Sequence, residues 1–122
     1  MPVTVIVESP YAAKSKWWLV ALWQRWRNRV YARQCCLDCV LRGESPLASH
    51  LLGPQYLDDN DPVERRLGIE CGLAWGFHAE KTIAYVDYGI SAGMQLGIDN
   101  AQKAGRPVIH RRILSKGKVG RV

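Results

Sequence analysis

The sequence predicts an α/β fold, a three-layer sandwich around a parallel sheet of about four strands. Short β-branched apolar runs alternate along the chain with longer segments of helical periodicity, and this alternation is typical of parallel β-α-β units. The length of 122 residues corresponds to one domain. Hydrophobic residues make up 48% and charged residues 23%, which is typical of a globular protein with its own core.

The first β-α unit is expected in residues 3–42. Residues 3–8 form a nearly continuous apolar run that predicts a buried strand, and Ser9-Pro10 ends it. Residues 11–42 then read as one long helix or two with a kink, and Gly43 is placed to end it. One face of this helix repeats apolar residues at intervals of three and four: Leu19, Leu22, Trp23, Trp26 and Val30. This face is expected to pack against the body of the protein or against a second subunit.

The second unit is expected in residues 45–76. Residues 47–52 predict a short strand, and Gly53-Pro54 a turn. Asp61, Pro62 and Glu64 suit the N-cap, first and third positions of a helix that ends near Gly76. The expected inward face of that helix comprises Leu67, Cys71, Ala74 and Trp75.

The third unit completes the predicted domain, residues 1–114. Residues 82–87 predict a strand, and Ser91 is expected to cap a helix over 91–104 that Gly105 ends. Met94, Ile98 and Ala101 would face inward. A fourth strand begins at 107–111, and residues 115–122 are expected to form a basic tail.

The net charge of +6 is unevenly distributed. Residues 1–42 carry seven Lys/Arg and two Asp/Glu, residues 43–75 carry two and six, and residues 76–122 carry eight and three. This basic–acidic–basic order favours an anionic small ligand or complementary surfaces in an oligomer, and makes nucleic acid an unlikely partner. The apolar runs are far shorter than a membrane span requires, so no membrane partner is expected. The tryptophans and basic residues of 14–29 leave binding to a membrane surface or to single-stranded nucleic acid as less favoured alternatives.

The four cysteines predict no disulfide framework, because three of them lie within five residues. No signal peptide is expected either, so reduced thiols in a cytoplasm are the prediction. A zinc site would need a second pair of ligands at suitable spacing. Thiols packed against the core are therefore favoured, and no metal or cofactor is expected.

The candidate site lies at the carboxyl ends of the strands, where open parallel sheets bind ligands. The residues expected there are Glu8, Ser9, Pro10, Tyr11, Ser49, His50, Asp58, Asp59, Asp87, Tyr88, Gly89, Ser91, Gly93 and Met94. Glu8 and Asp87 are the candidate catalytic groups, because a carboxylate that ends a buried strand is costly without a partner or a function. The other residues are candidates for ligand binding.

Each candidate role has a structural alternative. The helix start at Ser91–Gly93 would hold phosphate or ribose, but Gly89 and Ser91 also suit a plain turn and cap. The Asp58–Asp59 loop would bind ribose hydroxyls or simply be solvated. Tyr11 or Tyr88 could stack on a base. His50 could act as a general acid or base, or be a structural histidine.

Several of these motifs resemble a known family. Residues 5–12, 48–52, 57–62, 68–70 and 87–94 resemble small uncharacterised proteins of phage and bacterial genomes that are similar to nucleoside 2-deoxyribosyltransferases. The resemblance covers residues 3–12 and 35–112, and residues 14–34 are expected to be a Trp-rich helical insertion. It implies a flavodoxin-like sandwich, a nucleoside-type ligand and a homo-oligomer.

The resemblance leaves catalysis open. The transferases use a nucleophilic glutamate on the helix after the third strand, and two residues separate it from a preceding Gly-Met pair. Here Gly93-Met94 is followed by Gly97 at that position, and Ser91 stands where the transferases have an aspartate. A covalent glycosyl intermediate needs a nucleophilic carboxylate. Glu8 or Asp87 would have to supply it from a strand end.

The sequence therefore supports three functional hypotheses. The first is binding of a nucleoside, nucleotide or ADP-ribose-like ligand, including sequestration of a nucleotide signal in the host cytoplasm by a phage protein that counters host defence. The second is hydrolysis or transfer at an N-glycosidic bond. The third is recognition of a host protein through the Trp-rich helix.

Overall fold

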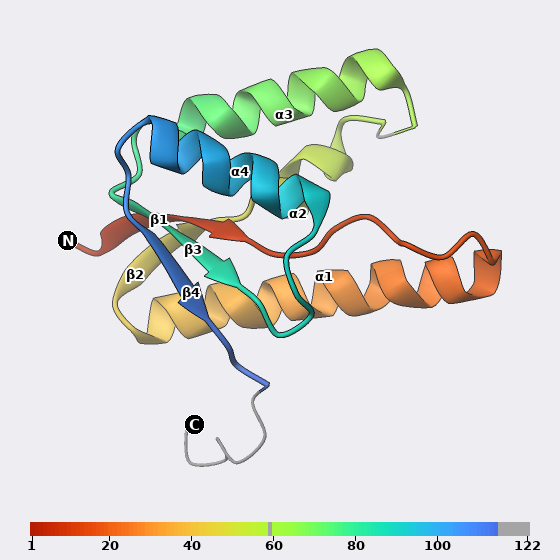
Figure 1. Ribbon diagram of the computed structural model, residues 1–122, viewed down its shortest axis with the longest axis horizontal. Helices are drawn as coiled ribbons and strands as arrows, with labels where there is room; N and C mark the ends of the chain where they lie inside the picture. The colour runs from red at the N-terminus through yellow and green to blue at the C-terminus, as the bar shows by residue number, and fades with distance from the viewer. Residues whose placement is uncertain (59, 115–122) are drawn as a thin grey trace.

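The computed structural model describes residues 1–58 and 60–114 of the chain and has an α/β architecture. A four-stranded sheet has the order β2-β1-β3-β4, all pairs are parallel, and helices cover both of its faces (Figure 1). The elements are β1 (Val3–Glu8), α1 (Trp18–Leu41), β2 (Glu44–Leu47), α2 (Ser49–Leu52), the 3-10 helix η1 (Gly53–Gln55), α3 (Pro62–Gly76), β3 (Lys81–Tyr85), α4 (Ala92–Lys103) and β4 (Val108–Arg111). The predicted α/β class and three-layer arrangement are confirmed.

Two hydrophobic clusters lie on opposite faces of the sheet. On the α1 face, Val5 and Val7 of β1 and Ile83 and Tyr85 of β3 pack against Tyr31 and other buried residues. On the other face, Ala84 packs with Met94 and Ile98 of α4. β3 therefore has buried residues on both faces, whereas β1 has fully buried residues on the α1 face and the half-buried Ile6 and Glu8 on the other.

Helix α4 agrees with its prediction in detail. The hydroxyl of Ser91 accepts a hydrogen bond from the Met94 amide at 3.2 Å, which caps the helix. Met94, Ile98 and Ala101 are buried. Gly105 has a φ of +73°, the left-handed conformation that ends a helix.

The prediction of a second strand over residues 47–52 is wrong. β2 is Glu44–Leu47, and residues 49–52 form helix α2. A six-residue apolar run fits a short strand or a short buried helix equally well. Pro46 is accommodated because β2 lies at the edge of the sheet, where a missing N–H leaves no ladder bond unmade.

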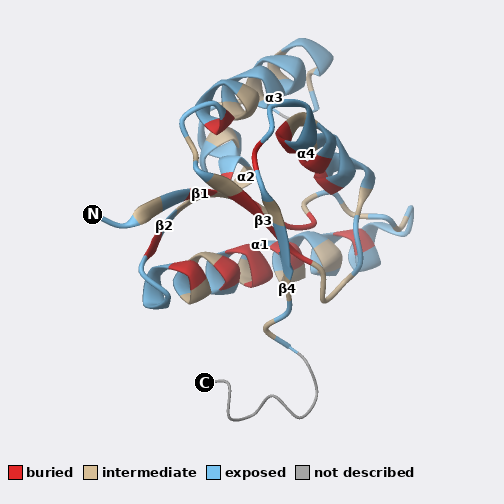
Figure 2. Cartoon of the chain, turned by 60° about the vertical axis from the view of Figure 1, so that its left-hand side comes forward, coloured by how far each residue is buried: buried red, intermediate tan, exposed pale blue. Residues whose placement is uncertain are grey.

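Helix α1 turns a different face inward from the predicted one, and it begins at Trp18 instead of near residue 11. Its buried residues are Ala21, Asn28, Tyr31, Ala32, Cys35 and Cys39. Leu19, Leu22, Trp23 and Trp26 are exposed, so their predicted packing against the body of the chain is wrong, and packing against a second subunit stays a prediction. The helix has two apolar stripes, and the sheet packs on the one with alanines and thiols, which allow close approach. Figure 2 shows these buried turns of α1 in red.

Helix α3 begins and ends as predicted, but its inward face also differs. The Asp61 carboxylate caps it by accepting a hydrogen bond from the Val63 amide at 2.9 Å. The expected inward residues Leu67, Cys71, Ala74 and Trp75 are exposed. The helix instead approaches the body through Gly68, Gly72 and Gly76, where an added Cβ would lie 3.1 Å from Leu57, Ser49 and Arg106 respectively. Glycines therefore set this helix close to α2 and to the connection that precedes β4.

No helix in residues 1–58 and 60–114 has both the length and the apolar character that crossing a bilayer requires.

Candidate functional site

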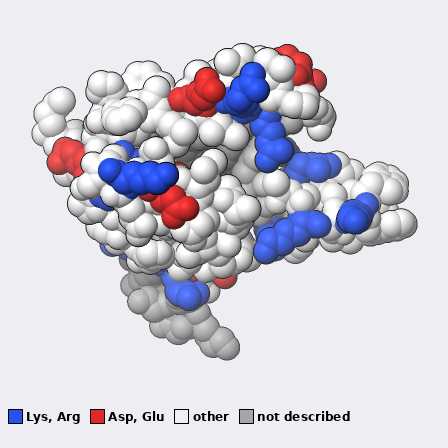
Figure 3. Space-filling view, turned by 45° about the horizontal axis from the view of Figure 1, so that its top comes forward, with Lys and Arg blue, Asp and Glu red and all other residues white. Residues whose placement is uncertain are grey.

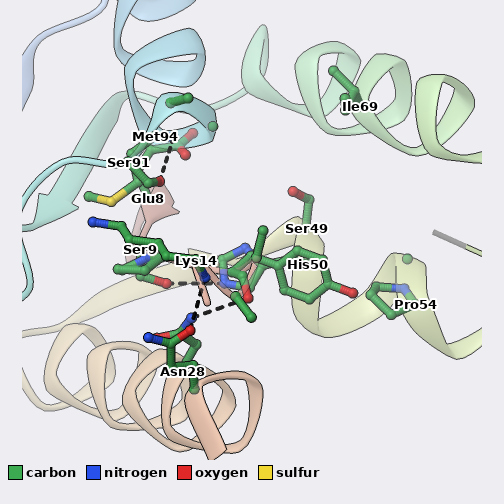
Figure 4. A pocket seen from close by; sticks show the side chains of 18 of the residues that line it. Glu8, Ser9, Lys14, Asn28, Ser49, His50, Pro54, Ile69, Ser91 and Met94 are labelled. Carbon is green, nitrogen blue, oxygen red and sulfur yellow. Dashed lines mark hydrogen bonds between the residues drawn. The ribbon is translucent and has the colours of Figure 1, made fainter. Parts of the chain in front are cut away.

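A cavity of about 690 Å³ opens at the carboxyl-terminal edge of the sheet, between the first half of α1, α2, α3 and the start of α4 (Figure 4). Most of the residues predicted from the sequence line it: Glu8, Ser9, Pro10, Tyr11, Ser49, His50, Tyr88, Ser91, Gly93 and Met94. The expectation that open parallel sheets bind ligands at the carboxyl ends of their strands thus located the cavity from the sequence.

Among the described residues that line the cavity, Glu8 is the only acidic one. Its carboxyl is withdrawn from water at the end of β1, and this burial raises its pKa to about 8, against an opposing effect of the nearby Arg106 charge. Glu8 is therefore largely protonated at neutral pH and is able to donate a hydrogen bond or a proton to a ligand.

The Glu8 side chain points toward α4 and packs on Gly97. A Cβ built on Gly97 would collide with the Glu8 carboxyl oxygens. The carboxyl also borders a second, smaller cavity of about 120 Å³ between α3 and α4. The buried Arg106 lines that cavity and donates to the Thr82 hydroxyl at 2.9 Å and to the Gly76 carbonyl at 2.7 Å. The Glu8 carboxyl thus lies between the two cavities.

A hydroxyl and an imidazole lie near Glu8. Ser9 Oγ and His50 Nε2 are 3.0 Å apart, and either atom can donate, depending on the tautomer. The Tyr11 ring lies over the His50 ring at a centroid distance of 5.4 Å. The two aromatic rings and the hydroxyl make this wall of the cavity suited to a ring-shaped ligand with polar edges.

Three cations that the sequence did not suggest as site residues also line the cavity. Lys14, Arg27 and Arg65 reach the cavity from the β1–α1 connection, α1 and α3. The Arg27 guanidinium lies 4.0 Å from the centroid of the Tyr88 ring, a cation–π arrangement. On the face shown in Figure 3, Lys and Arg side chains gather around a hollow on one side.

The connection before α1 is held so that Lys14 faces the cavity. The Gln24 side-chain oxygen accepts hydrogen bonds from the Lys14 and Ser15 amides at 2.9 and 3.0 Å. Asn28 donates to the Tyr11 carbonyl at 3.2 Å. The first half of α1 is thus a wall of the site, although the sequence pointed to it as an insertion. No signal along the chain brings Lys14, Arg27 and Asn28 together, because their proximity depends on the hydrogen bonds of Gln24 and Asn28 in the folded protein.

The start of α4 opens on the cavity. Ser91 uses its hydroxyl to cap the helix, as described above, and Gly93 has open space where a side chain would be. The helix start provides backbone amides and the positive end of the helix dipole, which favour a phosphate or carboxylate.

Three predicted site residues lie outside the cavity lining. Asp87 accepts hydrogen bonds from Tyr31 at 2.5 Å and from the Ile113 and Leu114 amides at 2.9 and 2.8 Å, and it does not line the cavity. Burial would raise the pKa of Asp87, but these hydrogen bonds outweigh it and lower the pKa.

The other two, Gly89 and Asp58, belong to loops. Gly89 makes a turn with a φ of +83°. Asp58 accepts a hydrogen bond from the Asn60 amide at 2.9 Å within its own loop and is not a lining residue. Asp59 lies outside the described residues.

The cysteines show no arrangement for metal binding in the described chain. Cys35 and Cys39 are buried in the core, Cys36 is half-buried, and Cys71 is exposed. Burial raises the pKa of Cys39 to about 11, so its thiol stays protonated. No cluster of three or more His, Cys, Asp or Glu suited to a metal ion occurs among the described residues.

A protein-family model covers nearly the whole chain. The model of a domain of unknown function, DUF7768, matches residues 3–111. The match includes the strand ends, the first half of α1 and the start of α4, which together form the cavity. A search of curated proteins found no match.

Proposed function

The chain belongs to the DUF7768 family, and from its own cavity we propose that it binds a nucleotide-like ligand: a nucleoside, a nucleotide or an ADP-ribose-like molecule. The observation that carries this proposal is that one cavity combines three cations with a buried carboxyl whose pKa is about 8. Its volume, about 690 Å³, lies in the range typical of small-molecule sites.

The two kinds of group suit different parts of the ligand. Lys14 and Arg27 attract a phosphate on the side of α1, and Arg65 adds positive charge from α3. The protonated Glu8 carboxyl suits the uncharged sugar or base, to which it donates a hydrogen bond. Tyr11 over His50 offers a surface on which a base stacks.

Binding is tested by incubating the protein with nucleosides, nucleotides and ADP-ribose derivatives, and analysing retained and filtered fractions by liquid chromatography. We expect retention of an intact compound, with the phosphorylated form held more tightly than its nucleoside. Gly93→Val fills open space in the cavity and should abolish retention. Ala74→Val, on the exposed face of α3, is the matched control. If every compound passes through unchanged, the proposal is wrong.

Cleavage or transfer at an N-glycosidic bond is the second candidate, favoured by the position of Glu8 at the cavity floor. A carboxyl with a pKa near 8 is suited to protonating a departing base. Most glycosidases use two carboxyl groups for this chemistry. The described lining supplies one, and for this reason binding is the first proposal.

The same incubation separates the two candidates. Free base in the filtrate indicates N-glycosidic chemistry, which Glu8→Gln should abolish while Glu70→Gln, on the exposed face of α3, leaves it unchanged. An intact compound released only by denaturation indicates a binding module. That second outcome would fit sequestration of a nucleotide signal, the role expected of a phage protein that counters host defence.

A further inference from the structure

The outer side of α1 carries an apolar face that no other part of the described chain covers. This outer face, opposite the residues packed on the sheet, consists of Leu19, Leu22, Trp23, Trp26, Val30, Leu37, Val40 and Leu41. All of them are exposed except Val30, which is half-buried. The face follows a helix of 24 residues, about 36 Å long. The exposed Arg33 and Gln34 interrupt the face between Val30 and Leu37, and its largest part is the cluster Leu19, Leu22, Trp23 and Trp26 in the first half of the helix. Monomeric proteins rarely expose clusters of large apolar side chains of this kind.

The charge around the outer face has one sign along most of the helix. No Asp or Glu occurs between Glu8 and Asp38. The cations in this interval are Lys14, Lys16, Arg25, Arg27, Arg29 and Arg33, of which Lys14 and Arg27 line the cavity and Arg25, Arg29 and Arg33 are exposed on α1. Asp38 is already paired with Arg42 at 2.9 Å. The surface that fits this face is therefore both apolar and anionic.

We propose that the outer face of α1 binds the surface of an anionic lipid bilayer, with the helix lying in the plane of the interface. Tryptophan and arginine are the residues that interfacial helices use, since the indole sits at headgroup level and the guanidinium pairs with phosphate. The aliphatic residues between them enter the acyl boundary. Such a helix rests on the membrane and does not span it, in keeping with the absence of a spanning helix in the described residues.

Two other occupants fit the observations less well. If α1 paired with α1 of a second copy, Arg25, Arg29 and Arg33 would face the same arginines of the other copy. Residues 9–37 contain no Asp or Glu that could neutralise them. Single-stranded nucleic acid binds aromatic rings that line a groove. Here the tryptophan rings lie among leucine and valine side chains on the exposed side of a helix and do not line a groove. The aliphatic side chains cannot form hydrogen bonds with a base.

Flotation with lipid vesicles tests the proposal on the full chain. We expect the protein to float with vesicles of phosphatidylcholine and phosphatidylglycerol, to bind phosphatidylcholine alone weakly, and to show a blue shift of tryptophan emission on binding. Arg25→Gln and Arg29→Gln should each lower the partition coefficient about fivefold, because a cation near an anionic bilayer contributes about that factor.

Two matched double variants distinguish binding through the outer face of α1 from nonspecific hydrophobic binding. Leu19→Ser with Trp26→Ser removes residues that are 51% and 56% exposed on α1, and should abolish vesicle binding. Leu67→Ser with Trp75→Ser removes residues that are 46% and 62% exposed on α3, and should leave binding unchanged. Because all four side chains are exposed, circular dichroism and the melting temperature should change little in either variant.

Three outcomes would overturn the proposal. The first is no binding to phosphatidylglycerol vesicles, or an equal loss in both double variants. The second is a dimer, detected by light scattering, that Leu19→Ser with Trp26→Ser converts to a monomer, in a protein that does not float. The third is binding to an oligothymidylate that vesicles do not displace.

Discussion

The carboxyl of Glu8 occupies the space that a side chain at Gly97 would fill. Glu8 ends β1 and Gly97 lies in α4, so the two are neighbours through the packing of the helix on the sheet. The sequence motifs predict a resemblance to nucleoside 2-deoxyribosyltransferases, and that prediction would place a glutamate at position 97. In this chain a carboxyl reaches the same place from β1, on the floor of the cavity.

This contact makes residues 8 and 97 interdependent. We expect Gly97→Ala to destabilise the protein by about 1–3 kcal/mol, since the new methyl group overpacks the contact with Glu8. In a Glu8→Ala background the same change should cost little, because alanine is the better helix former. Urea denaturation of the four variants measures the coupling. Additive free energies would show that the two residues do not compete for space.

The raised pKa of Glu8 makes stability depend on pH. Its pKa is about 8 in the folded protein, against an ordinary value of 4.5, so between these values the folded chain binds a proton that the unfolded chain has released. Stability should therefore fall as pH rises from about 4.5 to about 8, by at most about 1.4 kcal/mol per pH unit. Glu8→Gln should flatten this slope and raise the melting temperature at pH 8 relative to the unmodified protein. An unchanged slope in the variant would refute the assignment.

An ion pair between the two edge strands, Arg111 with Glu44, should make the stability of the protein fall as the pH is lowered. Arg111 of β4 donates two hydrogen bonds to Glu44 of β2, at 2.6 and 2.7 Å, and these bonds lower the pKa of Glu44 to about 2 despite its burial. Stability from this pair is present above about pH 4.5 and is lost as pH falls toward 2.

Removing the arginine tests that pair. Arg111→Met leaves the Glu44 charge buried with Lys81, 3.5 Å away, as its remaining ion-pair partner among the described residues. We expect a loss of about 3 kcal/mol at pH 7 and a weaker dependence on acid, both measured by denaturant unfolding. Lys81→Met, which removes the longer and more exposed contact, should cost much less.

Asp87 is expected to stabilise the protein without taking part in ligand chemistry. Its carboxylate accepts hydrogen bonds from Tyr31 and from the backbone after β4. Asp87→Asn should lower the free energy of unfolding by about 1–3 kcal/mol, because it weakens charge-assisted hydrogen bonds. Ligand retention per folded molecule should stay constant. Loss of retention in a variant of normal stability would return Asp87 to the candidate catalytic groups.

The sequence predicted the elements that have local signals. A continuous β-branched run specifies β1, Asp61-Pro62 starts α3, and Ser91 with Gly105 bounds α4. Each of these signals depends on a few neighbouring residues, and the carboxyl ends of the strands then fix the edge at which the cavity lies.

The errors arose where tertiary contacts choose between local alternatives. Residues 47–52 suit a strand or a helix, and packing of Leu51 against the core accompanies the helix. Helix α1 has two apolar stripes, and periodicity alone does not say which one the sheet takes. Lys14 became a site residue through hydrogen bonds to Gln24, which a pattern search along the chain does not reveal.

One side of the first half of α1 lines the cavity, and its other side is exposed. Arg27 and Asn28 line the cavity, and Trp26, next to them in the chain, lies on the outer face. The two surfaces share one helix and meet at Arg27, whose guanidinium also lies 5.4 Å from the ring centroid of Trp23 on the outer face. Any partner that shifts this half-helix changes the affinity for the ligand, and the ligand must then change the affinity for that partner by the same factor.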